Sequence, residues 1–461
     1  SVTEVTIGSV SGSTAFGDTS DDTHQFTGSA DFGGNVTLRG DTTVRDNLIP
    51  LGMSGNTHTS NVTIGSGAAR YNTTGLRSVF IGQNTGYGSS ADIDDSVIIG
   101  YRAGNKLIDG IYNVYIGSNA GFNNTTAGTN VGIGYAALYS EGGDFGGNTA
   151  IGHNALTNQS GSVGGRMENT AVGASAGGNL TTGVRSVFVG TAAGVAVTTG
   201  GYNTMVGWRA GYGTTTGNSN TFIGNYAAQT NTTGYDNIAI GGSAMFGGTV
   251  AHDNVAVGRD ALYNIGKTAA AGNSVGVGNA AGKYSTGSYN TFVGSAAGLG
   301  GTTSAPYSSG GSNTAVGYSS LYSVTTGHSN TSLGVNAGYS ISSGVQNTFL
   351  GDRAGYSTTT GTNNTYIGLR AGTARNSFGS VAVGYYSLYN NAGSGNVAVG
   401  NNAGESNVYS IGITYIGYQS GRYATGANNT YIGYQSGNGV NGSSTGASNT
   451  ALGYQALTAF T

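Results

Sequence analysis

The chain has 461 residues, of which 88 are glycine, 2 are proline and none is cysteine. Collagen is excluded, because it needs glycine at every third position together with abundant proline. A disordered linker is excluded too, since 30 tyrosines and 13 phenylalanines exceed the aromatic content of such segments. We therefore expect an ordered chain in which glycine has a geometric role.

Charge and the reactive residue types exclude further classes of protein. Charged residues make up 8% of the chain and the net charge is −3, so the basic stripe of a nucleic-acid-binding protein is missing. No run of 18 apolar residues occurs, which predicts no membrane insertion. The five histidines (His24, His58, His153, His252 and His328) are dispersed without metal-ligand spacing. We expect no metal and no cofactor.

The first 60 residues form a segment of their own. Six of the 15 aspartates lie between Asp18 and Asp46. Asp18, Asp21 and Asp22 are candidate cation ligands, but the glycine and glutamate of an EF-hand loop are missing. We favour the alternative, a solvated acidic turn within a small amino-terminal β cap or attachment segment covering residues 1–60.

A short repeat runs from Asn61 almost to the end, with the pattern Asn-Thr/Val-x-Ile/Val/Leu-Gly-x-x-Ala. We refer to its glycine as the motif glycine; it occurs 23 times, from Gly65 to Gly453. Successive motif glycines are 16 to 18 residues apart in 18 of 22 intervals. The four longer intervals end at Gly173, Gly278, Gly317 and Gly453, and they predict loop insertions in an otherwise constant coil.

Such a unit cannot bury its apolar face alone, whereas stacked units form a continuous core. Residues 61–461 are therefore predicted to form an all-β, parallel β-solenoid or β-roll of about 23 coils of about 17 residues. At a strand spacing of roughly 4.8 Å the stack would be about 110 Å long.

The strand pattern suggests which residues are buried. The residue before the motif glycine is Ile, Val or Leu in all 23 copies, and the residue two positions earlier is Thr, Val or Ile. This alternation is typical of a short strand with one buried face. We predict that the aliphatic residue forms the core ladder and that the regular threonine also faces inward, which disfavours ice binding by a threonine array. The predicted core ladder includes Ile64, Ile81, Ile99, Ile116, Ile223, Ile240, Leu350, Ile367, Ile416 and Ile432.

Two further positions have a narrow choice of residue. The third residue after the motif glycine is alanine in 18 copies, which predicts a tight interior corner. The fourth residue before it is asparagine in 17 copies and serine in five. Stacked asparagines can form a hydrogen-bonded ladder along the axis, and asparagine can equally well begin a strand after a turn. The sequence does not decide between these two interpretations.

The residue between the two aliphatic strand positions points the other way and is often aromatic. We predict that these aromatics form an exposed stripe, which normally marks an interface. Lateral packing of several chains, most simply a homotrimer, would cover it; the alternative is a monomeric rod whose aromatics cover one another. The candidate interface aromatics are Phe80, Phe188, Phe222, Phe292, Phe349 and Tyr366.

These repeats resemble the head repeats of trimeric autotransporter adhesins of the YadA type, in which short Asn/Ser-x-x-Ile-Gly strands recur. The resemblance covers residues 61–461 and implies a left-handed parallel β-roll with three chains side by side. The segment from Ser13 to Ser29 is similar to one common in tail-fibre and other virion proteins of large tailed phages. It implies a virion or extracellular location.

An enzyme is the main alternative to a structural protein. Glycan hydrolysis needs two carboxylates about 5–10 Å apart. Glu141 and Asp144 lie close in sequence to each other, and Glu168 falls in the insertion one coil later. We favour solvated loop residues over a catalytic group and expect no enzymatic activity.

Tyrosine often follows the motif glycine and offers candidate surface-binding residues. Such a row could stack on sugar rings of a receptor, or each ring could stack on the coil below, and we favour the second. The row consists of Tyr101, Tyr135, Tyr318, Tyr385, Tyr418, Tyr434 and Tyr454.

The sequence as a whole predicts a non-enzymatic fibre protein, a phage tail fibre or virion fibre shaft that contacts a host surface glycan or protein receptor. The alternative is a bacterial cell-surface adhesin or extracellular filament subunit, and a glycan depolymerase ranks third. The last copy runs to Thr461 without a polar cap. Open strand edges invite pairing, so we expect either more chain or end-to-end contact with another fibre or virion protein.

Overall fold

The computed structural model describes residues 60–88, 91–140, 146–160, 167–267, 270–301, 308–373 and 376–459. The predicted amino-terminal cap and its aspartates lie outside the described residues. None of the described residues is helical, and 23 strands of three residues each recur along the chain. The strands are β1 (Val62–Ile64), β2 (Val79–Ile81), β3 (Val97–Ile99), β4 (Val114–Ile116), β5 (Val131–Ile133), β6 (Thr149–Ile151), β7 (Thr170–Val172), β8 (Val187–Val189), β9 (Thr204–Val206), β10 (Thr221–Ile223), β11 (Ile238–Ile240), β12 (Val255–Val257), β13 (Val275–Val277), β14 (Thr291–Val293), β15 (Thr314–Val316), β16 (Thr331–Leu333), β17 (Thr348–Leu350), β18 (Thr365–Ile367), β19 (Val381–Val383), β20 (Val397–Val399), β21 (Thr414–Ile416), β22 (Thr430–Ile432) and β23 (Thr450–Leu452).

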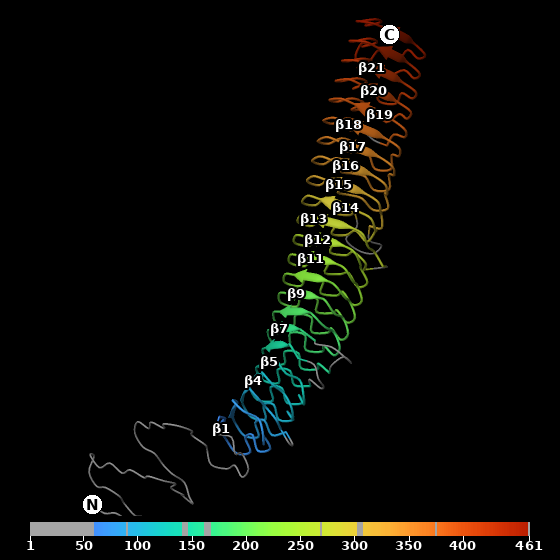
Figure 1. Cartoon of the computed structure of the whole chain (residues 1–461). Coiled ribbons are helices and arrows are strands. Elements are labelled where there is room, and N and C mark those ends of the chain that lie inside the picture. Colours follow the sequence, from blue (N-terminus) through green and yellow to red (C-terminus); the bar gives the residue numbers. More distant parts are fainter. Residues whose placement is uncertain are drawn as a thin grey trace, which may run out of the picture. The chain divides into compact units, whose positions relative to one another are not determined.

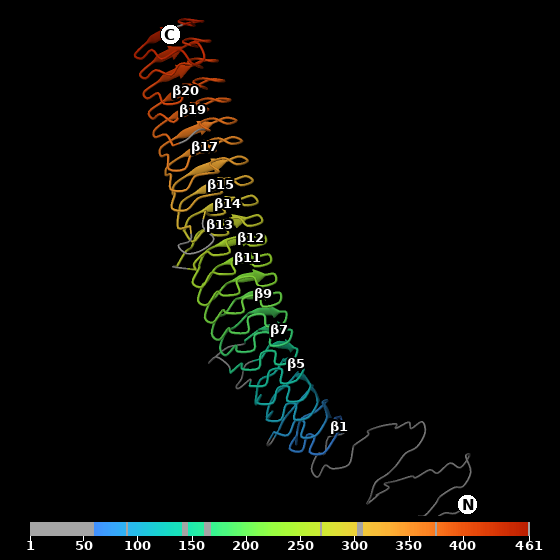
Figure 2. The same cartoon turned by 180° about the vertical axis from the view of Figure 1, so that it is seen from behind.

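Each strand pairs in parallel with the next strand in the chain. Thr221 of β10 pairs with Thr204 of β9 on one side and with Ile238 of β11 on the other, so equivalent residues of successive coils lie side by side. Figures 1 and 2 show the strands stacked in sequence order, as the colour gradient makes visible from both sides. The predicted parallel β-solenoid is confirmed, with about 22 turns.

The longer intervals do not disturb this register. Across the 20-residue interval before Gly453, Thr430 still pairs with Thr450, and the extra residues form a turn in which the Val440 N–H donates to the Ser444 hydroxyl at 2.7 Å. The strands on either side of the other three insertions also pair in register. All four insertions therefore leave the strand pairing in register.

The motif glycine is required by both backbone and packing. Gly224 has a φ of +136°, a conformation that other residues rarely adopt. A Cβ atom there would lie 2.6 Å from the carbonyl oxygen of Gly241, the motif glycine of the next coil. The motif glycines thus stack directly on one another, and glycine at this position ends every strand with the same bend.

The inside and the outside of the strands are the reverse of the prediction. The six candidate interface aromatics are buried, at 0–2% exposure, and they form the centre of the core. The predicted core ladder faces outward instead: Ile223 is 37% exposed and Leu350 is 40% exposed, whereas Phe222 between the two outward residues of β10 is 0% exposed. The predicted alternation is present, but the buried face is the opposite one. All ten residues of that ladder, Ile64, Ile81, Ile99, Ile116, Ile223, Ile240, Leu350, Ile367, Ile416 and Ile432, lie on the outer face.

The interior of each coil is filled from one of two walls. We call the middle residue of each strand the strand-centre residue, and the fourth residue after the motif glycine the opposing residue. In eleven coils the strand-centre residue is Phe, Tyr, Ile or Met, and the opposing residue is then glycine ten times and alanine once. In seven coils the opposing residue is Leu or Met, and the strand-centre residue is then alanine or glycine. A large side chain on one wall always faces a small one on the other.

Contacts across the interior explain this complementarity. A Cβ atom on Gly86 would lie 2.6 Å from the ring of Phe80 in the same coil. Where both residues are small, the neighbouring coils fill the space: a Cβ on Gly338 would lie 2.7 Å from Phe349 above and 2.8 Å from Leu321 below. Between these two walls one large side chain per level is therefore the limit. Further buried apolar residues, such as Leu107 and Ile265, fill another part of the interior.

The asparagine row forms the hydrogen-bonded ladder that the sequence left open. The backbone N–H of Asn237 donates to Oδ1 of Asn220 at 3.1 Å, and Oδ1 of Asn237 accepts the N–H of Asn254 at 3.2 Å. Nδ2 of Asn237 also donates to the carbonyl of Ala251 at 2.7 Å, in the turn that closes the same coil. Asn237 therefore links its coil to its neighbours and fixes the closing turn, and Asn203 and Asn220 make the same two kinds of contact.

Serine keeps the axial part of this ladder. The hydroxyl of Ser186 accepts the N–H of Asn203 at 3.1 Å, as an asparagine oxygen would. The hydroxyl of Ser78 also reaches the closing turn, where it donates to the Ile93 carbonyl at 3.0 Å, whereas that of Ser186 donates to the Val184 carbonyl at 3.2 Å. Ile413 is the one member of the row without a polar side chain.

We expect Asn237→Ala to lower the free energy of local unfolding by about 3 kcal/mol, because two buried backbone groups lose their partners at about 1–3 kcal/mol each. Asn237→Ser should cost clearly less, since serine retains the acceptor. Hydrogen exchange of the amides of β10 to β12 measures both. Equal losses for the two variants would show that the axial hydrogen bond contributes little.

Candidate functional surfaces

The first and third residues of each strand form an uncharged outer face, which we call the strand face. None of these residues is charged in any of the 23 strands, and the third is always Ile, Val or Leu. The aliphatic rows lie side by side in register, so each side chain is partly covered by those of the neighbouring coils. A continuous apolar surface of this kind is unusual for a lone soluble rod.

The threonines of the first strand position share this outer face, which corrects the expectation that they face inward. Ice binding is therefore not disfavoured by inward-facing threonines. Only 12 of the 23 first positions are threonine, however, and every third position is aliphatic. The strand face is an apolar surface with scattered hydroxyls and not a regular hydroxyl array.

The tyrosines after the motif glycine border this face and are exposed, at 41–73%. The rings of Tyr418 and Tyr434 are nearly parallel with centroids 5.1 Å apart, and those of Tyr434 and Tyr454 are 5.3 Å apart. Both faces of the Tyr434 ring are therefore covered, so a sugar ring can reach only its edge and hydroxyl. Stacking on the neighbouring coil is confirmed for these three residues, and receptor binding by the row stays a prediction.

The carboxylates proposed for glycan hydrolysis do not form a pair in the described part of the chain. Glu141 and Asp144 lie outside it. Glu168 is exposed and forms an ion pair with Arg185 of the next coil, with Oε2 3.1 Å from Nε. Within the described ranges no three His, Asp or Glu side chains gather where they could hold a metal ion. The hydrolase alternative stays untested.

Burial raises the pKa of three core tyrosines, Tyr366, Tyr415 and Tyr431. Burial raises the pKa of Tyr366 to about 12, although the hydroxyl of Ser377, which hydrogen-bonds to the phenol, opposes the shift. The folded chain thus favours the neutral phenol. This contribution to stability is complete below the unfolded pKa of about 10 and is lost as the pH rises towards 12.

The free energy of unfolding should therefore fall by about 2 kcal/mol between pH 10 and pH 12 on account of Tyr366. Denaturant titrations of the wild type and of Tyr366→Phe at both ends of this range measure the effect. Phenylalanine removes the ionisable group and keeps the ring, so the pH-dependent loss should be smaller by that amount. Identical pH dependence in the two proteins would contradict the assignment.

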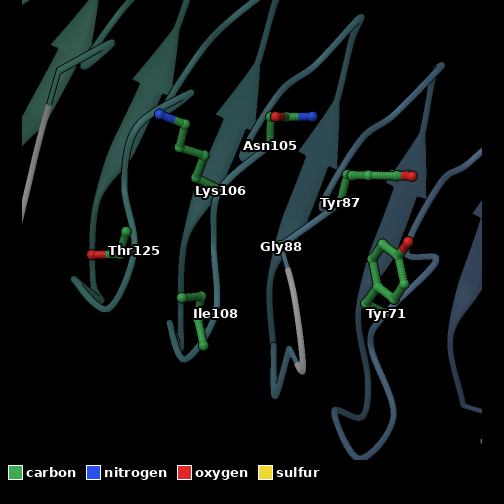
Figure 3. A pocket seen from close by; sticks show the side chains of 7 residues that line it. All are labelled: Tyr71, Tyr87, Gly88, Asn105, Lys106, Ile108 and Thr125. Atoms are coloured by element: carbon green, nitrogen blue, oxygen red, sulfur yellow. The ribbon is translucent and has the colours of Figure 1, made fainter.

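A groove that the sequence did not reveal crosses four coils near β1 (Figure 3). Its volume is about 440 Å³, and its lining combines aromatic, apolar and polar side chains. Its residue Tyr87 belongs to a row rich in aromatics five residues after the motif glycine, which also includes Phe122 and Tyr139, but no sequence motif joins the lining residues. We call it the Lys106 groove; its lining residues are Tyr71, Tyr87, Gly88, Asn105, Lys106, Ile108 and Thr125.

Comparison with known proteins gives no family for this chain. No protein-family model matches the sequence, and no curated protein matches it either. Across the described ranges, no helix is long and apolar enough to cross a membrane.

Proposed function

We propose that this chain is the shaft of an extracellular fibre, of the kind that tailed phages carry, and that it contacts the host surface without enzymatic activity. The observation that carries the proposal is the uninterrupted parallel ladder of 23 strands with an uncharged strand face along its whole length. The resemblance to YadA-type head repeats and to phage virion segments supports it.

Lateral packing of three copies through the strand face is part of this proposal. A face about 105 Å long and about 10 Å wide offers roughly 1,000 Å², similar to the 800 Å² per partner of a stable interface. The aromatics that the sequence assigned to the interface are in the core, so the aliphatic rows take their place. A left-handed coil, as in the resembling head repeats, would complete the likeness.

Sedimentation of the purified chain tests the assembly. The expected mass is three times the 45.8 kDa of one chain. A stable monomer at micromolar concentration would remove the lateral packing and leave a single solenoid with an exposed apolar face.

A further inference from the structure

The Lys106 groove has an aromatic end. The rings of Tyr71 and Tyr87, on successive coils, meet edge to face with centroids 5.1 Å apart at 79°. Arg70 Nη1 lies 3.5 Å from the Tyr87 hydroxyl, and the Arg70 guanidinium lies 5.6 Å from the centre of the Tyr71 ring. Tyr71 remains 39% exposed. Rigid aromatic surfaces with a polar edge suit the C–H face and the hydroxyls of a sugar ring.

The opposite end of the groove is cationic. Figure 3 shows Tyr71 and Tyr87 at one end and Lys106 and Thr125 at the other. Lys106 is exposed, with its ammonium 5.7 Å from the Phe122 ring. Neither Lys106 nor Arg70 has a carboxylate within 4.0 Å in the described part of the chain, although Arg77, Arg185, Lys283 and Arg422 each have one.

The surroundings of the lysine favour an anion. Asp92 and Asp109 are exposed near Ile108, but neither lines the groove. Asn105 uses its Nδ2 to hold the Asn84 carbonyl at 3.0 Å, which leaves its side-chain oxygen for a hydroxyl. The Lys106 ammonium is therefore surrounded by neutral hydrogen-bonding groups. This arrangement suits a ligand that carries a carboxylate together with several hydroxyl groups.

The groove is too long for a single sugar ring. Its residues come from four successive coils, a span of about 14 Å. None of the lining residues belongs to a strand, so the groove remains open when strand faces pack together. Its volume lies within the roughly 300–1,000 Å³ range of small-molecule sites.

We propose that the Lys106 groove binds an acidic oligosaccharide, with one sugar ring on Tyr71 and Tyr87 and a carboxylate at Lys106. The inference rests on the proposed function, because it names the receptor class that the fibre contacts. Aromatic packing supplies the affinity for the sugar, and the lysine selects the acidic sugar over a neutral one.

Calorimetric titration of the full chain with trigalacturonic acid, and with maltotriose as the neutral counterpart, tests the groove. Trigalacturonic acid should bind at least about tenfold more tightly than maltotriose, and Lys106→Gln should weaken its binding by about tenfold. Lys106→Arg should retain most of the affinity, and Tyr71→Ala should lose it. Arg259→Gln and Tyr409→Ala, which change a cation and an 81% exposed tyrosine outside the groove, are the matched controls.

Three results would overturn the proposal: no binding of trigalacturonic acid at about 10 mM, equal binding of the two sugars, or unchanged binding by both Lys106→Gln and Tyr71→Ala. Sedimentation separates this failure from that of the fibre. A chain that forms trimers without binding the acid refutes the groove alone, whereas a monomer that binds the acid refutes the fibre alone.

Discussion

Phe222→Ala is expected to lower the free energy of local unfolding by about 3–5 kcal/mol, the usual cost of removing a buried aromatic ring. Phe222 is 0% exposed, and its opposing residue, Ala228, is too small to fill the space that the ring leaves. The cavity should destabilise β9, β10 and β11, because the coils of a solenoid contact mainly their neighbours.

The second half of this test is a compensating substitution. Ala228→Leu alone should overpack the coil and cost about 1–3 kcal/mol. The double variant Phe222→Ala/Ala228→Leu moves the large side chain to the other wall, as in the next coils, where Met245 faces Ala239. It should lie within about 1.5 kcal/mol of the wild type, as volume-conserving exchanges do.

This coil suits the exchange of large and small side chains because its opposing residue is alanine and not glycine. Ala228 already has a φ of +48°, and leucines at equivalent positions, such as Leu262 at +46°, adopt the same backbone conformation. No glycine is therefore replaced, and the double-mutant cycle reports the packing between the two walls. Hydrogen exchange of the amides in β9 to β11 gives the local free energies. If the free-energy losses of the two single variants simply add in the double variant, a large side chain on one wall cannot replace one on the other, and the prediction is wrong.

Period and architecture could be predicted from the sequence because both follow from spacing. The recurrence of the motif glycine fixed the coil length, and Gly224 shows why no other residue suits it: its φ is +136° and the next motif glycine packs against it. Alternation within each strand also predicted that Ile223 and Phe222 lie on opposite faces.

Which face is buried could not be decided from alternation, since both faces are apolar. The sequence carried the answer elsewhere, in the correlation between strand-centre and opposing residues. Phe349 stands with Gly355, whereas Ala382 stands with Leu388. Such an exchange of large and small between positions six residues apart makes sense only if the two side chains compete for one space, and that space is the core.

The groove escaped prediction for a different reason. Tyr71, Lys106 and Thr125 belong to different coils and have no common motif. They come together because each coil adds one level to the stack. Only the register, together with the direction of each turn, makes neighbours of residues more than 50 positions apart.

Glutamates on the strand face are expected to convert the assembly into monomers. Val189, Ile223 and Val257 occupy the third strand position of alternate strands, β8, β10 and β12. Replacing all three by glutamate places charges in the proposed interface, where an unpaired buried charge is strongly unfavourable. Because alternate coils are used, the new charges are about 10 Å apart within one chain, and salt screens their mutual repulsion.

Sedimentation should then change from three times 45.8 kDa to 45.8 kDa. The control replaces Thr199, Thr216 and Thr233 by glutamate; these residues are on or next to the exposed closing turns of β8, β9 and β10 and add the same charge. The control should keep the mass of the wild type. Phe222→Ala, next to Ile223 in the chain, should also keep it, because its side chain is in the core and not on the strand face.

This contrast between adjacent residues separates the two possible interfaces. If the aromatic row formed the contact, Phe222→Ala would dissociate the assembly at little cost in local stability, and the glutamates would leave the mass unchanged. If the strand face forms it, the aromatic variant loses local protection while the glutamate variant loses only its partners. If the three glutamates in the closing turns also dissociated the assembly, net charge and not the strand face would govern assembly.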